Sequence, residues 1–150
     1  VEEEGARTLL TDEAHRLQAV HGDRRARQAR RFDGPHAVLP QGAEEAERAG
    51  RELRNPIEPT PAHLARGQQV FENVCAVCHG PGGQGDGPII GRFPNPPSLL
   101  AARAKGLPDG RVVHVIARGQ GIMPSHAAQV LPEDRWRVVL HLRRLQEGGR

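Results

Sequence analysis

The stretch Cys75-Ala76-Val77-Cys78-His79 decides how this sequence is interpreted, because it holds both cysteines of the 150-residue chain. A Cys-x-x-Cys pair alone is compatible with a redox disulfide, with half of a zinc site, or with covalent haem attachment. Tetrahedral zinc would need a second ligand pair at matching spacing, for which no further cysteine exists. A thioredoxin-like disulfide would need a βαβ context, which the flanking sequence does not show.

The histidine that directly follows the second cysteine favours haem attachment. Each thiol can add to one haem vinyl group and form a thioether, and the short spacing puts both sulfurs under one edge of the porphyrin. The next residue, His79, then presents its imidazole to the iron. The sequence therefore predicts one haem c, bound through Cys75 and Cys78 with His79 as an iron ligand.

The predicted sixth ligand is Met123, the single methionine of the chain, in Gly119-Gln120-Gly121-Ile122-Met123-Pro124. Glycines let the backbone approach a haem face, and Pro124 favours an extended conformation for the residue before it. The alternative is that Met123 is ordinary packing. Two histidines are rival ligands: His114 on a predicted helix, and His126 three residues after Met123.

Three motifs together resemble those of class I c-type cytochromes over about residues 56–147. They are Ala65-Arg66-Gly67 through Cys78-His79-Gly80, Gly85-Asp86-Gly87-Pro88 and Ile122-Met123-Pro124. A narrower set is similar to the monohaem cytochrome c subunit of alternative complex III, a bacterial quinol:electron-acceptor oxidoreductase. That set is Asn55-Pro56, Thr60-Pro61, Cys75-Ala76-Val77-Cys78-His79-Gly80, Phe93-Pro94-Asn95-Pro96-Pro97-Ser98-Leu99 and Met123-Pro124-Ser125.

The resemblance implies an all-α class I cytochrome c fold, with three or four helices around one covalent haem. It implies that the carbonyl of Pro88 accepts the other N–H of His79; alternatively, Pro88 merely ends the glycine-rich loop 80–87. Arg92 either pairs with a haem propionate or is a solvated loop residue. His126 stands where the family usually has an aromatic residue such as tyrosine.

Local signals predict three helices. The first runs from Pro61, capped by Thr60, into the attachment motif; the second spans about 109–118, capped by Asp109 and ended by Gly119; the third spans about 132–146, opened by Pro132. The resemblance to class I cytochromes implies that the first and last helices cross, and Gly67 with Phe71 against Trp136 and Leu140 fits that arrangement. Prolines 94, 96 and 97 exclude a helix there, so this stretch is a predicted loop around the porphyrin with Leu99 and Leu100 touching it.

The predicted organisation is an N-terminal arm over 1–55 with little core of its own, then a monohaem cytochrome c domain over 56–150. Segments 8–31 and 43–54 have local helical character. Three alternatives stay open for the arm: a tether from an upstream lipid anchor, an arm ordered against partner subunits, or a segment packed on the cytochrome domain. The first two together are favoured.

Composition limits the other function classes. Aromatic residues make up 3% of the chain, so a haem is expected to supply part of the apolar core. No apolar run approaches the roughly 20 residues of a membrane helix. The net charge of +3 comes without a dense basic patch carrying interleaved aromatics, so no nucleic-acid partner is predicted.

The expected function is electron transfer without an enzymatic site, because a six-coordinate haem has no open position for substrate. The resemblance implies a subunit that takes electrons from a multihaem subunit and passes them to a terminal oxidase or a soluble carrier. The main alternative is a free or lipid-tethered periplasmic carrier with transient partners; a haem enzyme or gas sensor is a third. The expected location is the periplasmic side of a bacterial cytoplasmic membrane.

Overall fold

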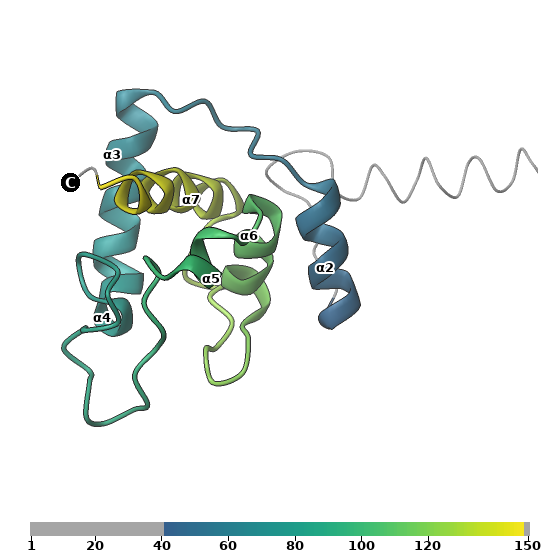
Figure 1. Ribbon diagram of the computed structural model, residues 1–150. Coiled ribbons are helices and arrows are strands. Elements are labelled where there is room, and N and C mark those ends of the chain that lie inside the picture. Colours follow the sequence, from purple (N-terminus) through teal and green to yellow (C-terminus); the bar gives the residue numbers. More distant parts are fainter. Residues whose placement is uncertain (1–40, 149–150) are drawn as a thin grey trace, which may run out of the picture.

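The computed structural model describes residues 41–148, which are helical and contain no β-strand, only two isolated bridges. The elements are α2 (Ala43–Glu52), α3 (Pro61–Val70), the π-helical turn η1 (Phe71–Cys75), α4 (Ala76–His79), α5 (Ala102–Lys105), α6 (Asp109–Arg118) and α7 (Pro132–Gln146). Figure 1 shows their arrangement. Within this part of the chain, no helix has the length and apolar character needed to span a membrane. The predicted helical segment 8–31 lies outside the described residues.

Helices α3, η1 and α4 follow one another without a break and carry the chain from Pro61 to His79. The Thr60 side chain accepts a hydrogen bond from the His63 N–H at 3.3 Å, which confirms the predicted N-cap. The π-helical turn was not expected from the sequence. Such a turn inserts one residue into the helical register, so it changes the direction in which Cys75 and the residues after it project.

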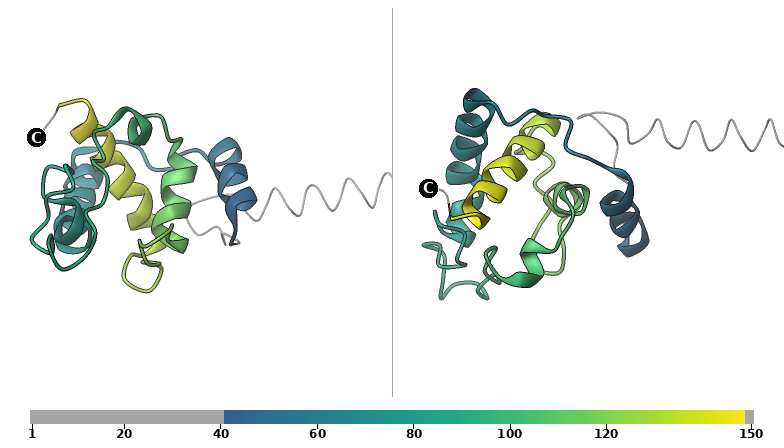
Figure 2. Two further views of the ribbon diagram at one scale, coloured as in Figure 1. Left: turned by 60° about the horizontal axis from the view of Figure 1, so that its bottom comes forward. Right: turned by 45° about the horizontal axis from the view of Figure 1, so that its top comes forward.

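The close crossing of α3 and α7 is the main packing contact of the fold (Figure 2). A Cβ atom added at Gly67 would overlap the backbone carbonyl of Arg137, so only glycine permits this approach. The predicted crossing of the first and last helices is confirmed. The atoms nearest to Gly67 are backbone atoms of α7 at Arg137 and Val138. Phe71 shares the central apolar cluster with Trp136, and its ring also packs on His141, with ring centroids 5.2 Å apart. The predicted contact with Leu140 stays a prediction.

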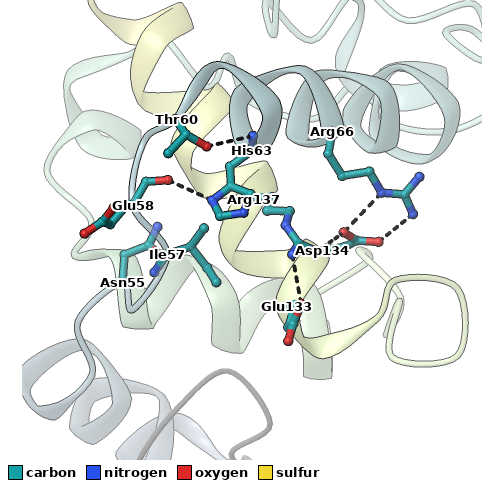
Figure 3. Close-up of polar contacts among 9 residues, drawn as sticks. All are labelled: Asn55, Ile57, Glu58, Thr60, His63, Arg66, Glu133, Asp134 and Arg137. Carbon is teal, nitrogen blue, oxygen red and sulfur yellow. Dashed lines mark hydrogen bonds and ion pairs between the residues drawn. The ribbon is translucent and has the colours of Figure 1, made fainter.

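An ionic cluster fixes the same crossing on its polar side (Figure 3). Two hydrogen bonds, of 2.6 and 3.2 Å, join the Arg66 guanidinium to the Asp134 carboxylate, whose side chain is only 4% exposed. Arg137 donates to Asp134 and to Glu133, each at 2.9 Å. The hydrogen bond from Arg66 is the largest cause that lowers the pKa of Asp134. Asp134 is therefore a stable carboxylate that ties α3 to α7.

Asn55 holds the connection between α2 and α3 against α7. Its Nδ2 donates to the Trp136 carbonyl at 3.1 Å, and its Oδ1 accepts the Ile57 N–H at 2.9 Å. The Trp136 side chain is 2% exposed and belongs to the central apolar cluster. The motif residue Asn55 thus has a structural role, because it holds the entry to α3 against the first turns of α7.

The second predicted helix agrees with α6 at both ends, but its predicted cap is wrong. Pro108 is the N-cap residue, in an extended conformation, and Asp109 is the first helical residue without a capping bond. The Asp109 carboxylate instead accepts from Arg143 of α7 at 2.8–2.9 Å, and Arg143 also donates to the Leu107 carbonyl. The Asp109 carboxylate, which the sequence predicts to cap its own helix, therefore pairs α6 with α7. The short helix α5 was not predicted.

Helix α2 packs along α6, as all three ribbon views show. Its buried residues are Ala46, Ala49 and Gly50, and a Cβ at Gly110 of α6 would overlap the Ala49 carbonyl. Residues 43–52 of the predicted arm are therefore packed on the rest of the structure, as the third alternative for the arm states. Residues 1–40 lie outside the described part, and the division of the chain at residue 55 stays a prediction.

Replacing Gly67 with alanine is expected to destabilise the holoprotein by about 3 kcal/mol, because the new methyl group must push α3 away from the Arg137 carbonyl. Chemical denaturation would measure the change. Gly82→Ala is the control, since its added Cβ would make only ordinary van der Waals contact with the Gln84 side chain, at 3.9 Å. Equal stability of the two variants would contradict the close crossing.

Acid is expected to weaken the α3–α7 contact through His141. Burial is the main cause that lowers the pKa of His141 from its ordinary 6.5; Glu72 opposes this shift and Arg144 adds to it. The neutral imidazole therefore contributes stability above pH 6.5, and this contribution is lost as the pH falls through the lowered pKa. Denaturation at several pH values should show a smaller loss of stability on acidification for His141→Phe than for wild type. If the stability of both proteins fell equally with pH, His141 would not be the group through which acid acts.

Candidate functional site

The Cys-x-x-Cys-His motif spans the last residue of η1 and all of α4. The helix ends directly after His79, where Gly80 has a φ of 74° and donates its N–H to the Ala76 carbonyl at 2.9 Å. Cys75, Cys78 and His79 are all partly buried. One short helical segment therefore presents both thiols and the imidazole.

The two cysteines are free thiols in the structure. Burial, and to a lesser extent Cys78, raise the pKa of Cys75 to about 12. A thiol with so high a pKa provides almost no thiolate at neutral pH, and thiolate is the form that attacks disulfides. This environment disfavours the redox-disulfide alternative and suits a thiol that becomes a thioether.

His79 lies in a setting that favours its neutral form, the form that binds a metal. Burial is the first cause that lowers the pKa of His79, and the proximity of His126 is the second. The His79 Nδ1 atom is buried and makes no hydrogen bond to any described residue. Such an orphaned ring nitrogen is unusual in a buried position, and it leaves one ring nitrogen of His79 without a hydrogen-bond partner among the described residues.

The predicted hydrogen bond from His79 to Pro88 is not formed, because His79 Nδ1 has no partner within residues 41–148. Pro88 is exposed, and the loop around it runs back along α4: Gly87 N–H donates to Cys78 and Ile89 N–H to Val77, each at 3.2 Å. The loop thus places Pro88 beside the attachment segment. Its role toward His79 stays a prediction for the haem-bound protein.

Met123 lies in a tight hairpin that follows α6. The N–H groups of Gln120 and Met123 each donate to the other's carbonyl at 3.0 Å. Gly119, with a φ of 77°, ends α6 where a Cβ would overlap the Met123 carbonyl. Ser125 Oγ then donates to the Ala117 carbonyl at 2.6 Å. The hairpin therefore folds back against the end of α6.

The two rival histidines occupy different places. His126 donates its backbone N–H to the Ile116 carbonyl at 2.9 Å, and its Nδ1 is buried without a described partner. Because His126 acts on the pKa of His79, the loop that carries Met123 lies near the attachment segment. His114 is 4% exposed and borders a hollow between the first turn of α2 and the end of α6, which Gly119 and Gln120 also line.

The loop residues predicted to contact haem differ in their surroundings. Arg92 is exposed and its side chain has no ion pair within the described residues. Leu99 packs against the central apolar cluster, its N–H donates to Gly83 at 2.8 Å, and its carbonyl accepts from Gln146 at 2.8 Å. Leu100 is half-buried beside it. The structure thus fixes Leu99 and leaves Arg92 in solvent.

Several large apolar side chains are exposed in the attachment segment and in the two long loops. They are Val77 (43%), Ile90 (38%), Phe93 (63%), Ile122 (71%) and Leu131 (67%). Most of the described apolar side chains of this size are buried or half-buried, so their exposure needs an explanation. A flat apolar group bound between the loops, or a partner protein, would cover them.

Comparison with known protein families supports this interpretation of the site. Residues 62–142 match the family described as "Cytochrome C oxidase, cbb3-type, subunit III". The chain belongs to this family. It therefore contains a cytochrome c domain with an all-α class I fold, and its function is haem-based electron transfer. No curated protein matches the chain.

The residues of this cytochrome c domain fit a covalent haem c. The fit rests on two free thiols and a partly buried imidazole, all presented by one short helical segment. When bound, the haem supplies an iron that cycles between the ferric and ferrous states. The protein's own contribution is to fix the thiols and the imidazole on one rigid helical segment and to shield them with the two loops.

Replacing either cysteine is expected to weaken covalent haem attachment, and replacing both is expected to abolish it. Acid–organic extraction separates non-covalent haem from the chain, and mass spectrometry of the extracted protein measures what remains bound. We expect the wild-type mass to include haem and the Cys75→Ala/Cys78→Ala mass to lack it. A haem-free mass for the wild type would contradict attachment.

Proposed function

We propose that this chain is a monohaem electron-transfer subunit of a quinol-oxidising membrane complex of the alternative complex III type, respiratory or photosynthetic. It would accept electrons from a multihaem subunit and pass them to a terminal oxidase or a soluble carrier. The resemblance of the attachment, Phe93–Leu99 and Met123–Ser125 motifs supports this assignment. One Cys-x-x-Cys-His motif in the sequence supports a single haem.

We assign His79 and Met123 as the two axial ligands. The observations that support the assignment are the hydrogen-bonded hairpin that holds residues 120–123 at the end of α6, and the electrostatic effect of His126, three residues after Met123, on the partly buried His79. With both axial positions filled by the protein, no position is open to substrate, so the site serves electron exchange alone. Methionine ligation also raises the reduction potential.

Exposed apolar side chains support a subunit over a freely diffusing carrier. Phe93, Ile122 and Leu131 are each more than 60% exposed, and they lie in the two loops that flank the attachment segment. A permanent interface buries such side chains, whereas transient redox encounters use small interfaces. The alternative remains a free or lipid-tethered carrier. Its test is whether the chain purifies alone.

The family description names a cbb3-type oxidase subunit, which favours a second candidate. In that case, the chain would deliver electrons within an oxidase complex and not within a quinol-oxidising one. Either assembly would present the domain on the periplasmic side of a bacterial cytoplasmic membrane, where thioether haem is attached. Membrane association would come from partner subunits or an upstream lipid anchor.

Met123→Ala is expected to remove the weak far-red charge-transfer band of methionine-ligated ferric haem and to open the reduced protein to carbon monoxide. Wild type and His126→Phe are expected to keep the far-red band in the ferric state and not to bind carbon monoxide in the reduced state. Optical spectra of the three holoproteins check this. Loss of a native ligand only in His126→Phe would show that His126, and not Met123, binds the iron. Carbon monoxide binding by the wild type would favour the enzyme or gas-sensor alternative.

Mass spectrometry of proteins that co-purify with the chain from gently solubilised membranes tests the assembly. We expect a multihaem cytochrome, an iron–sulfur subunit and polytopic quinol-site subunits. Recovery with the catalytic subunit of a cbb3-type oxidase would favour the second candidate. Recovery of the intact cytochrome alone would reject both complexes and establish a carrier.

A further inference from the structure

Arg111 connects three segments that lie far apart in the sequence. From the first turn of α6, its Nη2 donates to Gln120 Oε1 in the Met123 hairpin at 3.1 Å. Its Nη1 lies 3.3 Å from Glu47 Oε1 on α2. The Arg111 side chain is 16% exposed and that of Glu47 is 67% exposed. The guanidinium is thus held between α2 and the hairpin.

The hydrogen bond to Gln120 acts on Met123 through the backbone. Gln120 and Met123 bond each other in both directions at 3.0 Å, so the Gln120 backbone cannot shift without moving Met123. Beyond Met123, Ser125 and His126 anchor the chain to the carbonyls of Ala117 and Ile116. Before Met123, the Arg111–Gln120 bond is the described side-chain anchor, and it faces α2.

Helix α2 supports Arg111 by packing as well as by charge. A Cβ at Gly50 would lie 3.2 Å from the Arg111 Cβ, so the α2 backbone lies directly against the base of this side chain. Residues 43–52 lie outside the segment that matches the family, 62–142. The support of Arg111 is therefore an addition to the domain that the family defines.

We propose that Arg111 is a positioning residue for the axial ligand Met123, and that α2, through Glu47, is the element that steadies it. This inference rests on the assignment of Met123 as a ligand under the proposed function. Arg111 acts through Gln120 and limits how often the Met123 hairpin swings away from the position described here. Glu47 acts only through Arg111, so its effect must vanish when Arg111 is replaced.

The rate of hairpin opening can be measured on the ferric holoprotein with cyanide, which binds only when the methionine position is free. We expect Arg111→Gln and Gln120→Ala each to bind cyanide about three- to tenfold faster than wild type, from the loss of one charge-assisted hydrogen bond. Glu47→Gln should accelerate binding about twofold, as expected for a partly exposed ion pair. The far-red band should stay present in all three.

Double variants test whether the residues act as one unit. Arg111→Gln/Gln120→Ala and Glu47→Gln/Arg111→Gln should each be no faster than Arg111→Gln alone. Arg111→Lys should be intermediate, because it keeps the charge and loses the fork of donors. Arg103→Gln on α5 and Glu52→Gln on α2 make the same changes of side chain at exposed positions. Both controls should bind cyanide at the wild-type rate.

A merely structural role for Arg111 would show as faster global unfolding. Cyanide binding through a local opening should depend little on low urea concentrations, whereas binding through global unfolding should depend steeply on urea. The proposal would be overturned if Arg111→Gln or Gln120→Ala bound cyanide at the wild-type rate. It would also be overturned if the effects of the single variants on this rate added up in the double variants, or if the rate depended steeply on urea.

The same experiment separates this inference from the ligand assignment. If the wild type lacks the far-red band and Met123→Ala leaves its spectrum unchanged, the assignment of Met123 fails and the positioning role fails with it. If Met123→Ala loses the band while the Arg111 and Gln120 variants bind cyanide at the wild-type rate, only the positioning role fails.

Discussion

The contact on which the rest of this structure depends is the close approach of α3 and α7 at Gly67. There, the backbone of one helix lies against the carbonyl of Arg137 on the other, a distance that any side chain at residue 67 would prevent. Around it, Phe71 and Trp136 fill the apolar side, and the Arg66–Asp134 pair closes the polar side. Because α3 continues through η1 into α4, this crossing also sets where His79 stands.

The two proposed iron ligands, His79 and Met123, are held by backbone geometry more than by side-chain contacts. His79 ends a helix and is followed by a left-handed glycine, and Met123 lies in a hairpin that begins at another left-handed glycine. Loop residues 87 and 89 bond back to the attachment segment. The two segments that carry the proposed ligands are therefore fixed relative to α3 and α6 by short hydrogen-bonded turns, which suits a site that should change little between oxidation states.

Helix α2, which lies outside the segment that matches the family, is connected to the proposed haem site. It packs along α6 through small residues and meets Arg111, which in turn bonds the Met123 hairpin. A segment that the sequence suggests is a tether thus reaches, through two polar contacts, the loop that carries a proposed iron ligand. A partner bound to the N-terminal part of the chain could influence the haem site along this connection.

The sequence by itself determined the features that depend on local chemistry. The Cys-x-x-Cys-His spacing, the Thr60 cap, Pro132 and the ending glycines predicted the attachment segment and both ends of α6 and α7. The tertiary structure alone decided the features that depend on distant partners. The Asp109 carboxylate pairs with Arg143 and not with its own helix, the atom nearest to Gly67 is the carbonyl oxygen of Arg137, and α2 packs on α6. Local propensity cannot reveal these choices, because each is set by which charged or small residues the crossing helices bring together.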